Sequence, residues 1–326
     1  MRIQSMDDLF YPQYKLKTPI TIGTLFSGIG TPEMALKRIT SDYKALFKSE
    51  VDKHAIKNHE LIHGQITNLG DIRRISSIPP VDILHHSPPC QDLSIAGHMK
   101  GAKIGTRSGL MYETIRILKA TKIKPKVIIM EQVPNIVDPI FAEHLHAMQS
   151  ELELMGYSNY VHILKASNYG TPQKRIRAFM ISVPKGYAFQ EPKRIPLRYT
   201  WQDTWEKDSR TLTPFYLTPS QYKMFTTNSS PKYDRKQRFL DNLCREDYHL
   251  AQTLTTRGSD RDIDNFIKDD KGIRRITPLE AWRIMDISDE DFLKVTNSTP
   301  KTILYKQAGN AIVVSVYEAI LRQLIE

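Results

Sequence analysis

The sequence predicts an α/β protein built on a doubly wound, mainly parallel sheet, with a second and smaller domain. Between residues 19 and 183, short apolar runs alternate with longer amphipathic stretches, as in successive βαβ units. After Pro184 the chain becomes rich in proline, serine, threonine, tyrosine and tryptophan, and helical spacing is lost until Thr277. We therefore expect one sheet domain followed by a separate module.

The alternation assigns the elements in order. Strands are expected at PITIGTLF (19–26), KALFKSE (44–50), VDILHHS (81–87), PKVIIME (125–131), YVHILKA (160–166) and RIRAFMISV (175–183). Helices are expected at TPEMALKRI (31–39), VDKHAIKNHELI (51–62), SGLMYETIRILKAT (108–121) and FAEHLHAMQSELELMG (141–156). Residues 185–272 are expected to hold irregular or β structure. Helical spacing resumes at TPLEAWRIMDI (277–287), and the apolar C-terminal stretch from 305 to 325 is expected to return to the first domain.

Charge and cysteine content limit the class of protein. Lys and Arg number 46 against 36 Asp and Glu, and this net charge of +10 favours a polyanionic partner, although it could serve solubility alone. Only Cys90 and Cys244 occur, which excludes a disulfide framework and a Cys-rich metal site and favours a reducing cytoplasm. Apolar runs stay shorter than a membrane span, and the N-terminus does not resemble a signal peptide.

A glycine loop follows the first predicted strand. Gly28 and Gly30 lie between strand and helix, where Thr31 can cap the helix and Pro32 suits its first position. Glu50 ends the next strand, where a carboxylate can take both ribose hydroxyls of an adenosine cofactor. A plain tight turn is the alternative.

Glu33 occupies the place of the third glycine in the dinucleotide fingerprint. A pyrophosphate then has no obvious binding place, which favours an adenosine ligand without phosphates.

Cys90 is the candidate nucleophile. Pro88 and Pro89 fix the backbone before it, and polar residues follow it, whereas a buried structural thiol is the alternative. A thiol attacks as the thiolate, so a nearby cation or helix N-terminus is needed.

Three charged residues could serve that nucleophile. Glu131 ends a predicted strand and could transfer a proton, while Arg175 and Arg177 could bind an anion or stabilise developing charge. The His85–His86 pair could suggest a metal, but it has no third placed ligand, and we predict none.

With these motifs in order, the chain closely resembles the DNA (cytosine-5) methyltransferases of bacteria and phages. The matching segments are the cofactor loop LFSGIG, the nucleophile motif SPPCQDLS, EQV for Glu-Asn-Val, PQKRIRAFMI for Gln-x-Arg-x-Arg, RRITPLEAWRIM and the closing YKQAGNAI. The resemblance implies the S-adenosylmethionine-dependent methyltransferase fold. It implies that Cys90 attacks carbon-6 of a cytosine flipped out of duplex DNA, and that carbon-5 takes a methyl group from S-adenosylmethionine. Glu131 would protonate ring nitrogen 3, Arg177 would face the exocyclic oxygen, and Arg175 would lie near the nucleophile and its phosphate.

The resemblance also assigns binding residues and domains. Cofactor-binding positions would be Phe26, Gly28, Ile29, Gly30, Glu50, Val51, Gln65, Ile66, Pro89, Leu110 and Asn310; DNA-binding positions would be Gln91, Ser94 and Arg257. The catalytic domain would comprise 1–186 and 304–326, the target-recognition domain 187–274, and a connecting hinge 275–303. The expected partner is double-stranded DNA, and no membrane contact is expected. The protein is expected to be a cytoplasmic monomer that associates with the nucleoid when it binds DNA. A cognate restriction enzyme could act on the same DNA site.

Several residues depart from the family pattern. They are Thr24 for Asp, Thr31 and Ser87 for glycines, Val51 for an aromatic, Gln65 for Asp and Gln132 for Asn. Three other functions stay open: a tRNA cytosine-5 methyltransferase, a catalytically silent DNA-binding protein and a cysteine hydrolase. The tRNA branch carries a Cys-Phe-Thr tripeptide that this chain lacks, and the hydrolase would need a histidine base that no motif singles out.

Overall fold

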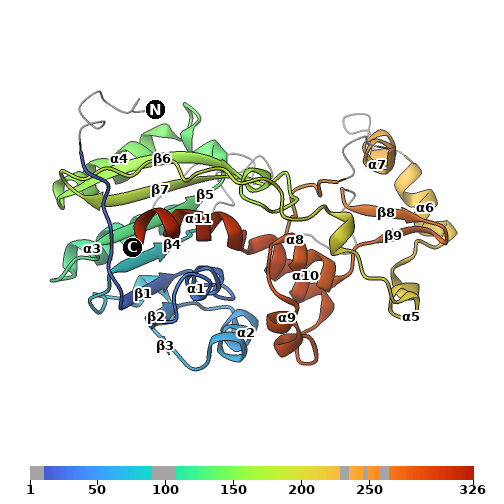
Figure 1. Ribbon diagram of the computed structural model, residues 1–326, viewed down its shortest axis with the longest axis horizontal. Coiled ribbons are helices and arrows are strands. Elements are labelled where there is room, and N and C mark those ends of the chain that lie inside the picture. The colour runs from blue at the N-terminus through green and yellow to red at the C-terminus, as the bar shows by residue number, and fades with distance from the viewer. Residues whose placement is uncertain (1–10, 90–107, 228–234, 245–248, 257–263) are drawn as a thin grey trace. The chain divides into compact units, whose positions relative to one another are not determined.

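The computed structural model describes residues 11–89, 108–227, 235–244, 249–256 and 264–326, which form two compact units (Figure 1). Unit 1 comprises Met1–Leu164, Ile176–Arg194 and Val316–Glu326, and unit 2 comprises Lys165–Arg175 and Ile195–Ser315. The predicted functional domains stay predictions. The compact units differ from them, because unit 2 also contains residues 165–175 and 275–315 and unit 1 also contains residues 187–194.

Unit 1 is built on a seven-stranded sheet in the order β3-β2-β1-β4-β5-β7-β6. The strands are β1 (Ile20–Leu25), β2 (Tyr43–Ser49), β3 (Thr67–Asn68), β4 (Ile83–His86), β5 (Val127–Gln132), β6 (Tyr157–Lys165) and β7 (Ile176–Pro184). β1 to β5 pair in parallel, whereas β7 runs antiparallel to β5. The winding direction reverses between β1 and β4, and ligands of such sheets bind beyond the strand ends at this switch point. The predicted doubly wound fold is confirmed.

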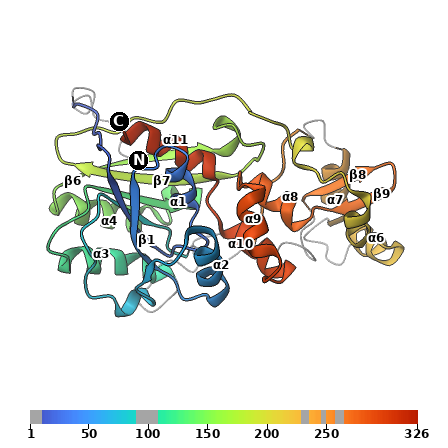
Figure 2. The same ribbon diagram turned by 60° about the horizontal axis from the view of Figure 1, so that its bottom comes forward.

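Helices cover both faces of this sheet (Figures 1 and 2). They are α1 (Thr31–Lys37), α2 (Lys53–His63), α3 (Met111–Ala120), α4 (Ala142–Leu154) and α11 (Val314–Leu324). Ile115 of α3 and Met148 of α4 belong to one apolar core with Leu84 of β4. His85 points to the opposite face, where its ring meets that of Tyr317 on α11 at 5.1 Å. The helices and strands expected between residues 19 and 183 are all present.

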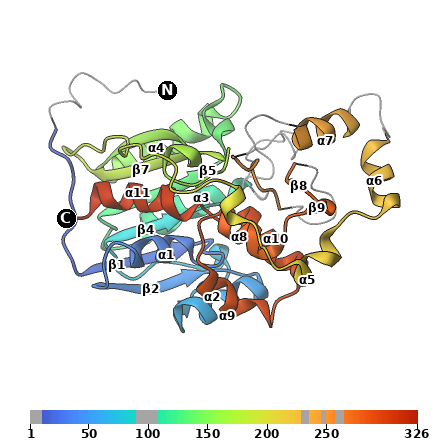
Figure 3. The same cartoon turned by 45° about the vertical axis from the view of Figure 1, so that its right-hand side comes forward.

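Unit 2 contains an antiparallel pair of short strands and several short helices (Figure 3). They are β8 (Phe266–Asp269), β9 (Gly272–Arg275), α5 (Ser209–Leu212), α6 (Pro219–Thr226), α7 (Arg235–Cys244), α8 (Pro278–Ile284), α9 (Asp289–Thr296) and α10 (Lys301–Asn310). No helix in the described parts of the chain is long and apolar enough to span a bilayer.

The expectation of irregular or β structure over residues 185–272 is wrong for α5, α6 and α7. Helices α6 and α7 each bury one phenylalanine, Phe225 and Phe239, against Phe266 of β8. Phe225 is the one buried residue of α6, which leaves little periodic signal, whereas α7 also packs Leu240 and Leu243 against this cluster, at helical spacing from Phe239. A further signal is the capping box at the start of α6, in which Thr218 and Gln221 bond each other's backbone.

Candidate active site

The cofactor loop, residues 26–30, connects β1 to α1 at the switch point. Phe26, Gly28 and Gly30 have φ angles of 58°, 55° and 81°, in the left-handed region. A non-glycine residue such as Phe26 is seldom found there, and such conformations concentrate at functional sites. The predicted cap at Thr31 is wrong, because Gly30 holds the N-cap position without a side-chain hydrogen bond and Thr31 is already helical.

Glu50 is fixed against this loop. Its Oε2 accepts a hydrogen bond of 2.9 Å from the backbone N–H of Gly28, and its Oε1 accepts from those of Val51 and Asp52 at 2.8 and 2.9 Å. Carboxylate oxygens have further lone pairs, so ribose hydroxyls can still donate to them.

The surroundings of Glu50 fit a nucleoside. A Cβ atom on Gly28 would meet no atom of the described residues within 4 Å, so the loop faces open space as far as these residues are concerned. The side chain of Val51 is 65% exposed and offers an apolar surface next to the carboxylate. Open space, an apolar surface and a fixed carboxylate are what an adenosine moiety requires.

The other predicted cofactor residues are distributed over both units. Ile29 is buried in the loop, Gln65 is exposed and Ile66 half-buried just before β3, and Leu110 and Pro89 are half-buried. All of these belong to unit 1. Asn310 is exposed at the end of α10 and belongs to unit 2.

Glu131 and Arg177 meet at the carboxyl end of β5. Because β7 is antiparallel to β5, its first residues lie beside the last residues of β5. Arg177 Nε lies 3.1 Å from Glu131 Oε1, and Ser87, directly after β4, donates a 2.6 Å hydrogen bond from Oγ to Glu131 Oε2. The carboxylate is buried and held on both oxygens, in an arrangement suited to presenting it in one orientation.

Gln132 joins this pair to the segment that leads to the predicted nucleophile. Its Nε2 donates a 2.7 Å hydrogen bond to the carbonyl oxygen of Pro88. Cys90, Gln91, Ser94 and Arg257 lie outside the described residues. Ser87 and Gln132 are both departures from the family pattern, and their polar side chains next to Pro-Pro-Cys and Glu131 are the sequence signal for a structural role.

Arg175 is a buried residue of unit 2. Its guanidinium donates to three carbonyl oxygens, those of Leu254 at 3.0 Å, Gly309 at 3.1 Å and Ala311 at 3.0 Å. These contacts hold three segments of unit 2 together. A role for Arg175 near the nucleophile stays a prediction.

His85 and His86 are structural in their surroundings. They point to opposite faces of β4, so they cannot ligate one ion together. Burial lowers the pKa of His85 to about 4 and that of His86 to about 3. Within the described ranges, no group of three or more His, Cys, Asp or Glu side chains could hold a metal ion.

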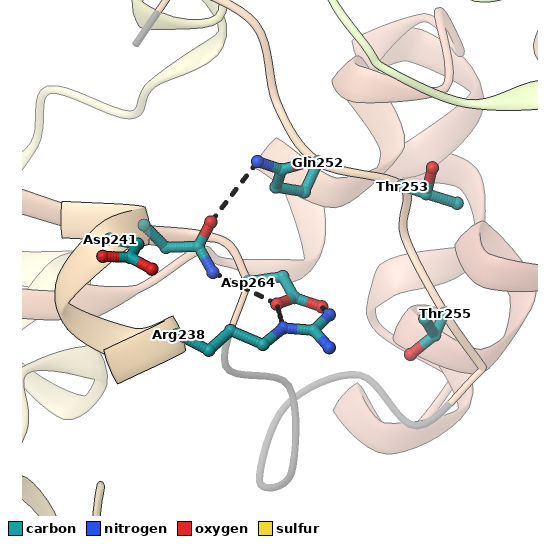
Figure 4. A pocket seen from close by; sticks show the side chains of 7 residues that line it. Arg238, Asp241, Gln252, Thr253, Thr255 and Asp264 are labelled. Atoms are coloured by element: carbon teal, nitrogen blue, oxygen red, sulfur yellow. Dashed lines mark hydrogen bonds and ion pairs between the residues drawn. The ribbon is translucent and has the colours of Figure 1, made fainter. Parts of the chain in front are cut away.

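Unit 2 contains a polar cavity of about 340 Å³ between α7 and the chain before β8 (Figure 4). It is lined by Arg238, Asp241, Asn242, Gln252, Thr253, Thr255 and Asp264. Arg238 Nε donates to Asp264 at 2.6 Å, Asn242 donates to the same carboxylate at 3.1 Å, and Gln252 donates to Asn242 at 3.3 Å. The stretch AQTLTTRGSD, from which only Arg257 was singled out, supplies three lining residues.

Comparison with known proteins identifies this arrangement. The family model for C-5 cytosine-specific DNA methylases matches residues 20–326. The chain belongs to this family. It is a DNA (cytosine-5) methyltransferase, as the motifs predicted, and the predicted family and enzyme class are confirmed.

Relatives of the methylase come from bacteria and phages. Type II methyltransferase M2.ScrFI of Lactococcus lactis subsp. cremoris is 33% identical over 297 residues, covering 88% of this chain and 80% of the relative. Orphan methyltransferase M.SPRI of Bacillus phage SPR is 25% identical, covering 94% and 97%. Among solved structures, Entamoeba histolytica methyltransferase EhMeth has a TM-score of 0.76 at 16% identity, covering 93% and 97%, which shows a shared fold.

Proposed function

We propose that the methylase modifies carbon-5 of cytosine within one specific double-stranded DNA sequence, with Cys90 as nucleophile and S-adenosylmethionine as methyl donor. This proposal rests on the contacts of Glu131 with Arg177 and Ser87. They lie at the carboxyl ends of β4 and β5, and the chain continues from β4 to Cys90.

Cys90 and Glu131 have different roles in the proposed reaction. The thiolate of Cys90 bonds to carbon-6, and the displaced electron pair is taken up at ring nitrogen 3, where Glu131 supplies a proton. Carbon-5 becomes enamine-like and is methylated; S-adenosylmethionine, when bound, supplies that methyl group. A base then removes the carbon-5 proton, the ring double bond re-forms, the carbon–sulfur bond breaks, and the proton at nitrogen 3 returns to Glu131.

The Glu131–Arg177 contact supports the roles proposed for these two side chains. Nitrogen 3 and the exocyclic oxygen are neighbours on one edge of cytosine, and the two side chains present a carboxylate and a guanidinium side by side. That edge is paired within a duplex, so the base must leave the helix to reach them. Arg177 would offset the negative charge that builds on the exocyclic oxygen.

The cofactor loop and Glu50 would hold S-adenosylmethionine. Glu50 would accept from the ribose hydroxyls, the backbone of the loop would approach the ligand closely at Gly28, and Val51 would contact the adenine. Glu33, a carboxylate in the first turn of α1, disfavours a phosphate there, which supports a cofactor without one.

Unit 2 would recognise the target sequence. Amide, hydroxyl and carboxylate groups around its cavity offer the donors and acceptors that read base edges. Gln91, Ser94 and Arg257 would contact DNA, and Arg175 would lie near the target phosphate. Relatives named both type II and orphan methyltransferases support a modification role, with or without a cognate restriction enzyme.

Bisulfite sequencing tests the proposal directly. Unmethylated genomic DNA treated with the purified protein and S-adenosylmethionine should show protected cytosines within one short motif. Cys90→Ser should bind the same DNA without protecting it. Methyl label entering tRNA and no DNA in a parallel reaction would contradict the proposed substrate, and turnover by Cys90→Ser would contradict the nucleophile.

A further inference from the structure

His63 contacts the backbone of the cofactor loop. Its Nε2 lies 3.1 Å from the carbonyl oxygen of Ile29. A carbonyl oxygen only accepts hydrogen bonds, so Nε2 of His63 carries the hydrogen. His63 is the last residue of α2, so this contact fixes a loop carbonyl from outside the loop.

The same histidine lies directly against Gly30. A Cβ atom there would lie 2.4 Å from Nε2 of His63 and 2.9 Å from Nε2 of His59. Side chains do not approach that closely, so glycine is required by this contact as well as by its φ of 81°. The two imidazole rings, one helical turn apart, have centroids 4.7 Å apart.

Glu33 of α1 anchors the histidine pair. Its side chain is 1% exposed, and Oε1 lies 3.5 Å from Nε2 of His59 and accepts a 2.9 Å hydrogen bond from Thr24 Oγ1. Burial alone would raise the pKa of Glu33, but the neighbouring His59 and His63 lower it to about 2. Glu33 is therefore a carboxylate at neutral pH, and its Oε1 faces His59.

Helix α2 is tied to the loop at both ends. Before its start, Glu50 accepts from the N–H of Gly28, and Asp52 caps the helix. At its end, His63 donates to Ile29. Helix α2 therefore supports both the carboxylate that is proposed to bind the ribose and the loop that is proposed to bind the cofactor.

We propose that His63 is a positioning residue that sets the affinity for S-adenosylmethionine by fixing the cofactor loop, with His59 and Glu33 holding it in place. This inference rests on the proposed function, because it takes the loop as the cofactor site. His63 acts through the backbone of Ile29, so it affects cofactor binding and leaves the chemical step unchanged. The contact of Glu33 with His59 also gives a reason for an acidic residue at position 33, where the dinucleotide fingerprint has its third glycine.

Two amide substitutions test the role of His63. His63→Gln keeps an N–H near the position of Nε2, whereas the shorter side chain of His63→Asn does not reach Ile29. By calorimetry, His63→Gln should bind S-adenosylmethionine within about twofold of wild type, and His63→Asn should bind about 3- to 10-fold more weakly, as expected for one lost hydrogen bond. The turnover number at saturating cofactor and the KM for DNA should stay unchanged. His54→Asn, at an exposed histidine in the first turn of α2, is the matched control.

Equal affinities of His63→Gln and His63→Asn would overturn the inference. A second measurement needs no variant: long-range ¹H–¹⁵N spectra of the wild-type imidazoles should show hydrogen on Nε2 of His63. A ring lacking hydrogen on Nε2 would overturn the inference even if the variants did not fold. Failure of the wild type to bind S-adenosylmethionine would instead refute the proposed function, and this inference with it.

Discussion

Gln132 donates a 2.7 Å hydrogen bond from Nε2 to the carbonyl oxygen of Pro88. The bond connects the end of β5, next to Glu131, with the proline step two residues before Cys90. The proposed proton donor and the proposed nucleophile are thus held on segments that are bonded to each other, and the length of the glutamine side chain is part of that connection.

Shortening Gln132 should therefore slow the reaction. Gln132→Ala leaves the carbonyl of Pro88 without this donor, and we expect the turnover number to fall about 5- to 10-fold, with the KM values for DNA and S-adenosylmethionine changed less than about twofold. Steady-state methylation assays measure both. A variant that loses DNA affinity but keeps its turnover number would contradict a positioning role for Gln132.

Ser87 should orient the carboxylate of Glu131. Ser87→Ala removes the 2.6 Å hydrogen bond to Oε2, whereas Ser87→Thr retains a hydroxyl. We expect the alanine variant to turn over about 10-fold more slowly, and the threonine variant to recover most of the rate. Single-turnover rates with prebound DNA report this step. Equal rates for the alanine variant and the wild type would show that Arg177 alone suffices to hold Glu131.

Glu33 should make stability depend on acid pH. The pKa of Glu33 is about 2 in the folded chain against 4.5 for an ordinary glutamate. A carboxyl whose pKa is lowered by folding stabilises the fold above its unfolded pKa, and this contribution is lost as the pH falls toward the folded pKa.

Glu33→Gln should then lower the free energy of unfolding at pH 7 by roughly 3 kcal/mol, which is what a carboxyl contributes when folding lowers its pKa from 4.5 to about 2. The difference from wild type should shrink as the pH falls from about 4.5 toward 2. Urea unfolding at a series of pH values measures it, with Glu143→Gln at an exposed site of unit 1 as the control. A difference that is constant with pH would rule out the ionised carboxylate as its source.

Arg274 and Glu280 should stabilise unit 2 only as a pair. Both side chains are buried, and two hydrogen bonds of 2.9 and 2.8 Å join them between β9 and α8. Arg274→Met leaves a buried carboxylate without its cation and should cost about 3–5 kcal/mol in urea unfolding. The double variant Arg274→Met with Glu280→Gln should recover part of this loss; a double variant less stable than the single one would contradict the charge argument.

Sequence predicted the sheet domain well because its strands are continuous apolar runs and its helices are periodic. Strands such as Val127–Gln132 are buried along their whole length, and α3 alternates its buried and exposed sides regularly. The short helix α6 gives little signal because it buries a single residue, Phe225, whose partner Phe266 comes from a distant segment. Helix α7 carries Phe239, Leu240 and Leu243 at helical spacing, but within an otherwise polar stretch.

The candidate site was predicted by motif, and its supporting contacts were not. Glu131 and Arg177 were both singled out, but their pairing depends on β7 running antiparallel to β5. Glu33 was noticed only as a missing glycine, since its partner His59 lies on another helix. Such contacts are tertiary, and no local pattern encodes them.

The insertion of β7 between β5 and β6 has a consequence during synthesis. Because β7 follows β6 in the chain but separates it from β5 in the sheet, a nascent chain that ends at β6 carries Glu131 without Arg177. The growing polypeptide therefore cannot form the pair until β7 has emerged from the ribosome and entered the sheet. A chain divided between β6 and β7 would place the two residues on separate fragments, and recovery of methylation on mixing would report the insertion of that strand.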